Sequence, residues 1–458
     1  MTAAMTPDLH DLLATLPPGS VITDPNSMDA YRWDRAGRDG AGDPLAVVRV
    51  TSTHDVQTVV RFAAAHRIPV VPRGAGSGLS GGSTAIDGCI VVSMDRMRDI
   101  AIDAVTRTAV VQPGLFNAEV KAAAAAHGLW YPPDPSSFEF CSIGGNVATN
   151  AGGLCCVKYG VTTDYVLGLT VVLADGTAVE LGGPRIKDVA GLSLTKLFVG
   201  SEGTLGIITE IVLKLIPAQR RATTLVATFG DLEGATRTVL DITRVMRPSM
   251  LEFMDRPTIN AVEDVTRMGL DRSAAAMLVI QSDEPSGHAD VEIAEIQRMC
   301  EANGASEVYS TSDPDEGEAF VTARRMAIPA VEQKGKLLLE DVGVPLPRLG
   351  DLVTGIEEIS RRHDTTIAVI AHAGDGNTHP LVLVDPTDAA QAARADIAYG
   401  EVMDLAIALG GTITGEHGVG RLKKAWLPAY LGSDVLALNT RVKKALDPEN
   451  ILNPGAVF

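Results

Sequence analysis

Two histidines flank a tight turn late in the chain. They begin and end the stretch HAGDGNTH, His372 to His379, which lies between the apolar runs TIAVIA and PLVLVD. Both runs have the character of strands and GDGN is a turn sequence, so the histidines are expected on the two arms of one hairpin. Imidazoles placed in this way can converge on a cation. Two hydrogen-bonded loop histidines would give the same pattern, so this motif alone leaves both interpretations open.

A second chemical motif, Glu416-His417, lies in the glycine-flanked stretch GGTITGEHGVG at residues 410–420. Its carboxylate can complete a site begun by two imidazoles, and the adjacent histidine can act as a base. Two imidazoles and one carboxylate leave coordination positions open, which is typical of a catalytic metal. Zinc is the first choice for this ligand set, and ferrous iron or manganese would also fit. A metal-dependent hydrolase is one reading of this chemistry.

Three glycine-rich stretches suggest a long bound cofactor. The first, PRGAGSGLSGG at residues 72–82, contains a GxGxxG pattern that begins at Gly76. A Rossmann loop opens a helix, whereas here another strand follows, so we reject that reading. The glycines can instead form a nest of backbone N–H groups for a pyrophosphate. A flexible surface loop is the alternative for one such stretch, but similar stretches at 142–160 and 198–209 favour one cofactor lying across all three.

The order of predicted elements indicates an α/β start followed by an α+β part. Residues 45–75 read as strand, helix and strand, and residues 166–182 as a β-hairpin turned at Asp175-Gly176. After Pro217 the pattern becomes two β-α-β units, which predicts an antiparallel sheet with helices on one face and a domain boundary near 218. A long helix is expected from about 387 to 409.

Composition narrows the class of protein. The 458 residues are 46% hydrophobic and carry a formal net charge of -18, which argues against binding to nucleic acid or anionic lipid. The first twenty residues lack the basic and apolar regions of a signal peptide, and no apolar stretch could span a bilayer. Five cysteines without CxxC spacing fit a reducing compartment. We therefore expect a cytoplasmic protein, with peripheral attachment to the inner membrane left open.

These motifs together resemble the vanillyl-alcohol oxidase and p-cresol methylhydroxylase superfamily. The resemblance covers nearly the whole chain and points to the branch with the glycolate oxidase FAD subunit, D-lactate dehydrogenase and D-2-hydroxyglutarate dehydrogenase. PRGAGSGLSGG looks like its pyrophosphate loop, YPPDPSS and CSIGGNVATNAGG like its flavin-contacting segments, and GSEGTLGIIT like its adenine-side loop. HAGDGNTHPLVLVD and GEHGVGRLK look like its metal and catalytic motifs.

The resemblance implies an α+β fold in three parts. Residues 1–218 would form a PCMH-type FAD-binding domain of two subdomains. Residues 219–410 would form an α+β cap domain for the substrate, with an antiparallel sheet and the metal-binding hairpin. Residues 411–458 would form a C-terminal segment that returns to the FAD domain and completes the active site.

The resemblance also implies roles for particular residues. FAD should be held without a covalent bond, because Ser77 and Gly78 stand where covalent members commonly carry a histidine. The residues expected to line FAD are Arg73, Gly74, Gly76, Ser77, Gly78, Pro133, Gly144, Gly145, Thr149, Gly152, Ile207 and Asn453. By position, His372, His379 and Glu416 would ligate the metal, and His417 would be the general base. Arg324 would bind the substrate carboxylate, with Arg325 as its rival.

The activity implied is the FAD-dependent oxidation of a small D-2-hydroxy acid, most simply glycolate or D-lactate. Ile328, Leu339 and Leu381 stand where enzymes for 2-hydroxyglutarate carry polar contacts to a second carboxylate, which favours a short monocarboxylic acid. D-2-hydroxyglutarate dehydrogenase remains an alternative, as does a noncatalytic FAD or electron-transfer subunit of a glycolate oxidase complex. The electron acceptor, whether a quinone, a carrier protein or oxygen, stays open, as do partner subunits or a homodimer.

Overall fold

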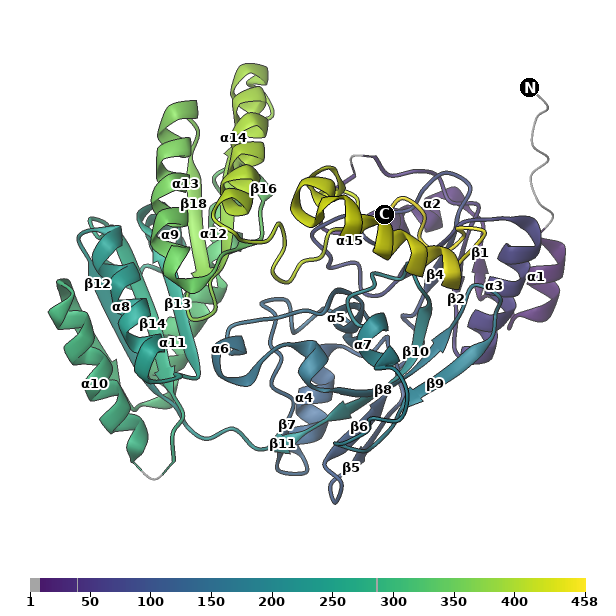
Figure 1. Cartoon of the computed structure of the whole chain (residues 1–458), viewed down its shortest axis with the longest axis horizontal. Helices are drawn as coiled ribbons and strands as arrows, with labels where there is room; N and C mark the ends of the chain where they lie inside the picture. The colour runs from purple at the N-terminus through teal and green to yellow at the C-terminus, as the bar shows by residue number, and fades with distance from the viewer. Residues whose placement is uncertain (1–8, 39, 286) are drawn as a thin grey trace. The chain divides into compact units, whose positions relative to one another are not determined.

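The computed structural model describes residues 9–38, 40–285 and 287–458 (Figure 1). Its contacts divide the chain into two compact units. The first unit combines residues up to Ala151 with Val161–Ala218 and Glu416–Phe458, and the second combines Gly152–Gly160 with Gln219–Gly415. The sequence predicts domain limits at 218 and 410. The chain leaves the first unit after Ala218 and re-enters it at Glu416, and a short piece of the glycine-rich stretch at 142–160 groups with the second unit.

The first unit contains two larger sheets and one short strand pair. The four-stranded sheet has the order β1-β2-β4-β3. Strands β2, β4 and β3 run parallel to one another, and β1 pairs antiparallel with β2. These strands are β1 (Val21–Ile22), β2 (Ala46–Arg49), β3 (Val70–Arg73) and β4 (Ile90–Ser93). Helix α3 (Thr53–His66) connects β2 to β3, which confirms the predicted strand-helix-strand start.

The second sheet of this unit is antiparallel, in the order β5-β6-β10-β8-β9. Its strands are β5 (Ile100–Asp103), β6 (Thr108–Val111), β8 (Val166–Val172), β9 (Ala178–Gly182) and β10 (Ile207–Lys214). The hairpin expected at 166–182 is confirmed, since β8 pairs with β9 and Gly176 has the positive φ that the turn requires. Short helices α4 (Asn117–Ala125) and α5 (Ile143–Thr149) contribute to the apolar core built on this sheet.

The second unit is built on one large antiparallel sheet with the order β15-β12-β14-β13-β18-β19-β16, and β17 also pairs with β19. The antiparallel pairing predicted for this part of the chain is confirmed. Its strands are β12 (Thr223–Phe229), β13 (Met250–Asp255), β14 (Ala276–Ser282), β15 (Ala305–Thr311), β16 (Lys336–Leu339), β17 (Val342–Gly343), β18 (Ile367–His372) and β19 (Asn377–Val384).

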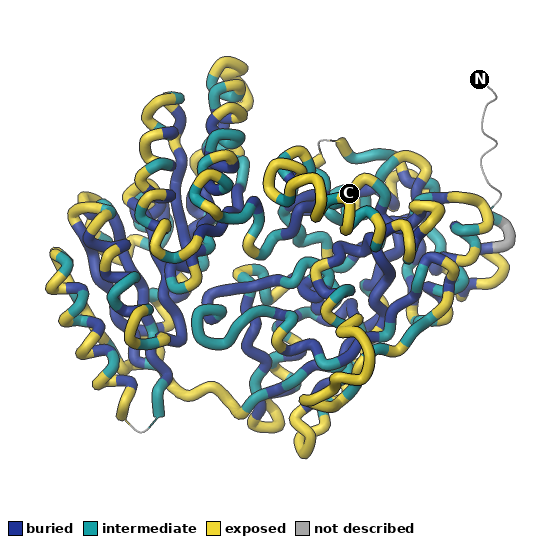
Figure 2. Tube along the Cα trace, in the orientation of Figure 1, coloured by how far each residue is buried: buried dark blue, intermediate teal, exposed yellow. Residues whose placement is uncertain are grey.

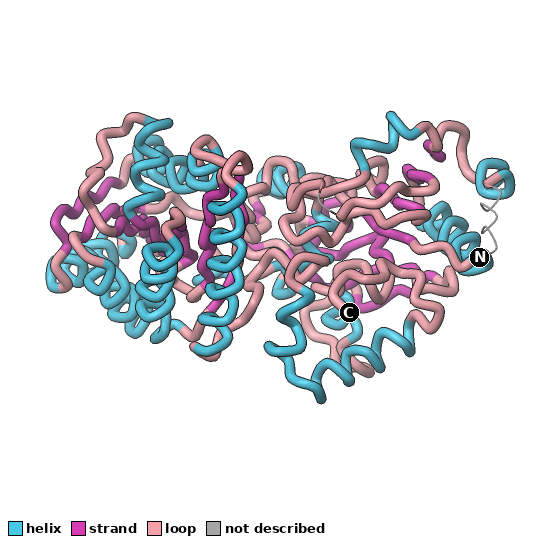
Figure 3. Tube along the Cα trace, turned by 90° about the horizontal axis from the view of Figure 1, so that it is seen from above, coloured by secondary structure: helices cyan, strands magenta, loops and turns pink. Residues whose placement is uncertain are grey.

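Helices cover both faces of this sheet, so the expectation of helices on one face was wrong. One layer contains α8 (Leu232–Val245), α10 (His288–Ala302), α13 (Leu349–His363) and α14 (Ala389–Ala408). The other contains α9 (Arg256–Thr266), α11 (Pro314–Arg325) and α12 (Ala327–Glu332). The reason lies in the central strands: every residue of β12 and β13 is buried, as expected for a strand that is covered on both sides (Figure 2). Figure 3 shows helices on either side of these strands.

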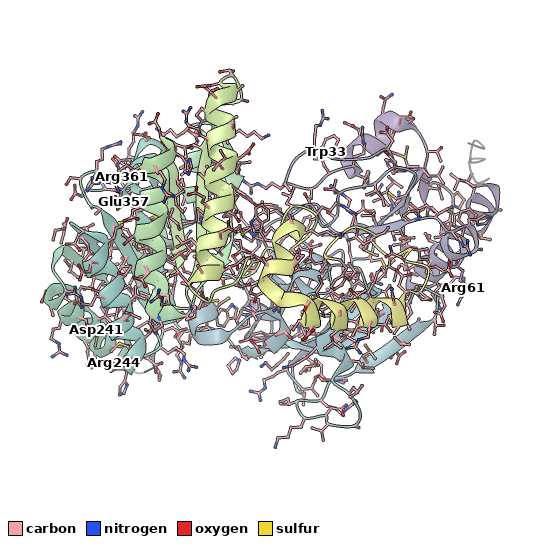
Figure 4. The ribbon with its side chains drawn as sticks, turned by 45° about the horizontal axis from the view of Figure 1, so that its top comes forward. Trp33, Arg61, Asp241, Arg244, Glu357 and Arg361 are labelled. Carbon is pink, nitrogen blue, oxygen red and sulfur yellow. The ribbon has the colours of Figure 1, made fainter. Side chains whose placement is uncertain are left out.

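The outer surface of the helical layers carries charges. Figure 4 labels Asp241 and Arg244 on α8 and Glu357 and Arg361 on α13. Arg244 NH2 lies 3.7 Å from Asp241 Oδ1. An exposed ion pair of this kind adds little to stability.

Among the described residues, no helix combines the length and the apolar character needed to cross a bilayer.

A buried ion pair fixes the C-terminal segment inside the first unit. On α15 (Leu427–Leu446), the Nζ of Lys443 donates to Asp447 Oδ2 at 2.5 Å, to the Thr204 carbonyl at 2.7 Å and to the Leu452 carbonyl at 2.8 Å. The Asp447 carboxylate in turn accepts the backbone N–H groups of Ile451 and Leu452. One ammonium group therefore ties the tail to the strand-entry loop that contains Thr204.

Lys443→Met should destabilise the protein by about 3–5 kcal/mol, because it leaves the Asp447 carboxylate buried without its counter-charge. Urea unfolding followed by circular dichroism measures the change. Lys444→Met, which alters an exposed neighbour, is the matched control and should change stability by less than about 0.5 kcal/mol. Equal effects of the two substitutions would contradict this account of the C-terminal tie.

Candidate active site

The first and third glycine-rich loops meet residues 142–151 of the second loop within the first unit. The Ser142 hydroxyl accepts the N–H of Ala75, which joins the second loop to the first. The N–H of Gly200 donates to Val147 at 2.9 Å and the N–H of Glu202 donates to Ala148 at 2.8 Å, which joins the third loop to α5. These bonds bring together segments that are far apart in the sequence, as one cofactor lying across all three would require.

The first loop presents unbonded backbone donors. It runs from β3 to β4 without an intervening helix, which confirms the rejection of a Rossmann loop. In the described part of the chain, no protein acceptor is recorded for the backbone N–H groups of four successive residues, Gly76, Ser77, Gly78 and Leu79. A run of donors in one loop, with a positive φ at Gly76, is the backbone arrangement that binds a pyrophosphate. The loop therefore fits the phosphates of FAD.

Two of the residues expected at FAD use their side chains to hold the loops. Arg73 is buried, and its guanidinium donates to the carbonyls of Ala30 and Trp33. The amide of Asn453 donates to the carbonyls of Gly82 and Glu202 and accepts from Arg421. The side chain of Asn453 thus fastens the C-terminal tail to the first and third loops.

The remaining expected residues are distributed as follows. Gly144, Gly145 and Thr149 lie on α5, Pro133 is buried in the preceding loop, and Ile207 opens β10. A Cβ on Gly144 would lie 2.4 Å from Pro113 Cβ, so only glycine fits there. These residues lie in the first unit, whereas Gly152 lies in the short segment Gly152–Gly160 that groups with the second unit.

Gly76→Ala should weaken FAD binding by about tenfold or more, because the added Cβ would lie 2.2 Å from the Arg73 guanidinium at a positive φ. Gly88→Ala is the matched control: Gly88 also has a positive φ and follows the same loop, but its Cβ would meet nothing within 4 Å. The fraction of flavin released on dilution, read from the fluorescence of free FAD, measures the difference. Equal flavin loss in both variants would exclude the loop as a binding element.

One face of the sheet in the second unit carries two of the three predicted metal ligands, His372 and His379. The register pairs Ile370 with His379, so His372, two residues further along β18, shares the face of His379. The same register places Glu252 of β13 directly beside His372, because Met254 pairs with Ile370 and Phe253 with Ala371. The two imidazole rings are 5.1 Å apart between centroids and nearly perpendicular, and a nitrogen of one lies within 4.8 Å of a nitrogen of the other. The hairpin predicted for the two histidines is confirmed.

The hydrogen-bond partner of His372 leaves one of its ring nitrogens available to bind a metal. Its Nδ1 lies 2.9 Å and 3.0 Å from the two oxygens of the Glu252 carboxylate. The carboxylate accepts a hydrogen bond from Nδ1–H, which leaves the lone pair of the neutral ring at Nε2, the atom that can bind a cation. A carboxylate behind the ring of this kind is a common companion of a metal-bound histidine.

Arg324 reaches the same carboxylate from α11. Its NH2 lies 2.7 Å from Glu252 Oε2, and both side chains are buried from solvent. Arg324 is therefore neither an exposed nor an unpaired helix charge. Its neighbour Arg325 instead pairs with Glu318 at 3.1 Å and is partly exposed.

A second buried carboxylate, that of Asp341, lies near His379 but beyond hydrogen-bond distance. Asp341 Oδ1 lies 3.7 Å from His379 Nδ1, and Asp341 Oδ2 accepts the Thr414 hydroxyl at 2.6 Å and the Gly415 N–H at 3.0 Å. Asp341 is fully buried. It therefore connects the histidine hairpin to the loop that ends one peptide bond before Glu416.

Glu416 and His417 begin the final segment of the first unit. Ser80 of the first glycine loop donates to the His417 carbonyl at 3.0 Å. The buried carboxylate of Glu202 in the third loop accepts the N–H groups of Val419 and Gly420, and burial raises its pKa to about 7. The backbone of His417 is thus fixed to the glycine loops.

Three buried acids at these positions, Glu252, Asp341 and Glu202, were not predicted from the sequence. Glu252 and Asp341 each follow or interrupt an apolar run, MLEFM and KLLLED. An ionised group in such a run needs a partner, since burying an isolated charge costs several kcal/mol. That rule could have marked both acids as candidates, but it could not have identified their partners.

Comparison with known families covers most of the chain. Residues 44–182 match a family described as FAD binding domain, and residues 218–457 match one described as FAD linked oxidases, C-terminal domain. The glycolate oxidase subunit GlcD of Bacillus subtilis is 41% identical over 418 residues, 91% of this chain and 89% of that protein. The D-lactate dehydrogenase of Archaeoglobus fulgidus is 34% identical over 437 residues, 94% of this chain and 95% of that protein.

Solved structures share the fold. p-Cresol methylhydroxylase, with substrate bound, superimposes with a TM-score of 0.82 at 18% identity, covering 97% of this chain and 95% of that one. 4-Ethylphenol oxidase from Gulosibacter chungangensis gives a TM-score of 0.80 at 21% identity with the same coverage. The PCMH-type fold expected from the sequence is confirmed.

Proposed function

Because the chain belongs to the family of FAD-linked oxidases, we propose that it oxidises a small D-2-hydroxy acid, glycolate or D-lactate, to the 2-oxo acid. Bound FAD would supply N5 as the acceptor of the hydride that leaves the α-carbon. The observation that carries the proposal is the buried pair His372 and His379 on one sheet face, with Arg324 beside it. The names of the relatives GlcD and D-lactate dehydrogenase agree with this class of substrate.

We assign the metal ligands to His372, His379 and Glu416. Both imidazoles project from one hairpin, and Glu416 follows Gly415, whose N–H is held by Asp341 beside His379. A divalent cation held there, zinc as first choice, would supply the positive charge that lowers the pKa of a substrate hydroxyl. His417, the next residue, takes the hydroxyl proton on a ring nitrogen as general base.

Arg324 is assigned to the substrate carboxylate. A guanidinium carries five N–H donors, so its contact with Glu252 through NH2 is compatible with a second carboxylate partner. Two-point binding, with the hydroxyl at the metal ligands and the carboxylate at Arg324, would orient the α-carbon for hydride transfer.

Apolar residues near the histidines favour a short substrate. Leu339 of β16 pairs directly with Leu381 of β19, two residues from His379 on the same face. Ile328 of α12 packs in the same apolar core. A second carboxylate would lose its hydration against these side chains, which disfavours D-2-hydroxyglutarate.

Anaerobic reduction of the bound flavin by a panel of acids tests the function. Glycolate, D-lactate, L-lactate and D-2-hydroxyglutarate are mixed separately with the purified holoenzyme, and bleaching of the flavin absorption is followed. Glycolate or D-lactate should bleach it fastest, with D-2-hydroxyglutarate slower by at least about 100-fold. Bleaching by none of the four would refute the proposal and favour a noncatalytic flavin subunit.

A further inference from the structure

Glu252 lies between the two groups that would bind the substrate. Its carboxylate contacts His372 Nδ1 at 2.9 Å and 3.0 Å, and it contacts Arg324 NH2 at 2.7 Å. The three residues come from β13, β18 and α11, and each is at most 4% exposed. One buried carboxylate therefore joins a predicted metal ligand to the predicted carboxylate-binding arginine.

Burying these charges contributes less to the stability of a fold than burying apolar side chains of the same size often would. Removing a carboxylate and a guanidinium from water costs several kcal/mol for each ion, and apolar residues of similar size often give equal or greater stability. The surrounding residues on this face, such as Met254 and Ile370, are apolar and buried. A stabilising role alone would be met by another apolar side chain, so the charges point to a task at the site.

We propose that Glu252 is a positioning residue that fixes the ring of His372 and the guanidinium of Arg324 at a set spacing. This inference rests on the proposed function, which assigns His372 to the metal and Arg324 to the substrate carboxylate. Glu252 accepts a hydrogen bond from Nδ1–H of His372, which selects the tautomer with its lone pair at Nε2. The same carboxylate holds NH2 of Arg324, so the position of the guanidinium is coupled to the position of Nε2 of His372.

The rigidity of this spacing follows from the sheet. Glu252 and His372 lie opposite each other on the neighbouring strands β13 and β18, and β18 continues into the histidine hairpin. A 2-hydroxy acid places its hydroxyl and carboxylate on adjacent carbons, so the two groups that bind them must stand at one fixed separation. Strand pairing fixes the spacing between Glu252 and His372 more tightly than a loop could, and the ion pair of Glu252 with Arg324 on α11 completes that separation.

Zinc affinity of the full-length protein provides the test. Purified variants are equilibrated with zinc against graded concentrations of a competing chelator, and retained zinc is measured by mass spectrometry, without any assay of activity. Glu252→Gln should weaken zinc binding by about 10–100-fold, and Glu252→Asp, which keeps the charge on a shorter arm, should be intermediate. Asp255→Asn is the matched control: it removes a buried acid from the same strand, one that caps α9, and should leave zinc affinity unchanged.

A double variant separates positioning from simple charge balance. Glu252→Gln leaves the Arg324 charge buried without its partner, whereas Glu252→Gln combined with Arg324→Gln removes both charges and should fold. If Glu252 positions His372, zinc affinity stays low in the double variant. Recovery of zinc affinity in the double variant, or wild-type affinity in Glu252→Gln, would overturn the inference.

His372→Ala distinguishes failure of this inference from failure of the proposed function. Loss of zinc in His372→Ala together with wild-type affinity in Glu252→Gln would refute only the role of Glu252. Wild-type zinc affinity in His372→Ala would refute the metal site itself, and the inference would fall with it.

Discussion

His417→Ala should abolish reduction of the bound flavin by glycolate or D-lactate while the purified protein stays yellow. A general base contributes about 10²–10⁴-fold to a proton abstraction, so we expect a loss of roughly 10³-fold in the rate of flavin reduction. FAD should remain bound, because the loops proposed to hold it are joined by bonds that do not involve the imidazole of His417. Anaerobic stopped-flow absorption with substrate measures the rate, and the flavin spectrum reports cofactor content.

The control for this variant is His127→Ala, which removes an exposed histidine from the first unit. It should reduce its flavin at the wild-type rate. A Gln side chain at position 417 would restore volume without basicity, so His417→Gln should be as slow as His417→Ala. Normal turnover in either variant would show that another group accepts the proton.

Removal of the metal should have an effect of similar size. A cation at His372 and His379 would contribute several kcal/mol to the abstraction of the hydroxyl proton, so protein treated with a chelator should lose about 10³-fold in flavin reduction. Zinc, manganese or ferrous iron added back should restore the rate to different extents, which identifies the metal. His379→Ala should mimic the chelator and resist rescue.

The matched control for metal removal is His363→Ala. His363 is a largely buried histidine of the same unit, at the end of α13, but it pairs with Glu401 rather than with the hairpin. Its variant should respond to chelation and to added zinc as the wild type does. Metal-free protein that reduces its flavin at the full rate would contradict the assigned role of the cation.

The local elements could be predicted from the sequence because each has a nearby cause. Asp175-Gly176 favours a turn between two strands, and Gly176 adopts the positive φ that this turn needs. The GDGN turn between His372 and His379 works in the same way, because the register that it sets is a property of adjacent residues. The absence of a helix after the first glycine loop could also be inferred, since Ser83 and Thr84 lead through the turn residues Asp87-Gly88 into the apolar run CIVVSM.

The coverage of the large sheet was harder to predict. Strands such as TTLVATF are apolar on both faces, a pattern that a buried strand shares with many short apolar segments. Only the packing of the helices, with α8, α10, α13 and α14 in one layer and α9, α11 and α12 in the other, shows that both faces are covered. The expectation of a single helical layer failed for this reason.

The sequence by itself determined the chemical types in this protein: two histidines on a hairpin, a Glu-His pair, and glycine loops with donors for a phosphate. It did so because turns, glycines and ligand types act over a few residues. The partners of Glu252, Asp341 and Glu202 were decided only by the tertiary structure. Their contacts, such as the 120-residue separation of Glu252 and His372, depend on which strands become neighbours, and strand pairing over that distance is a property of the whole fold.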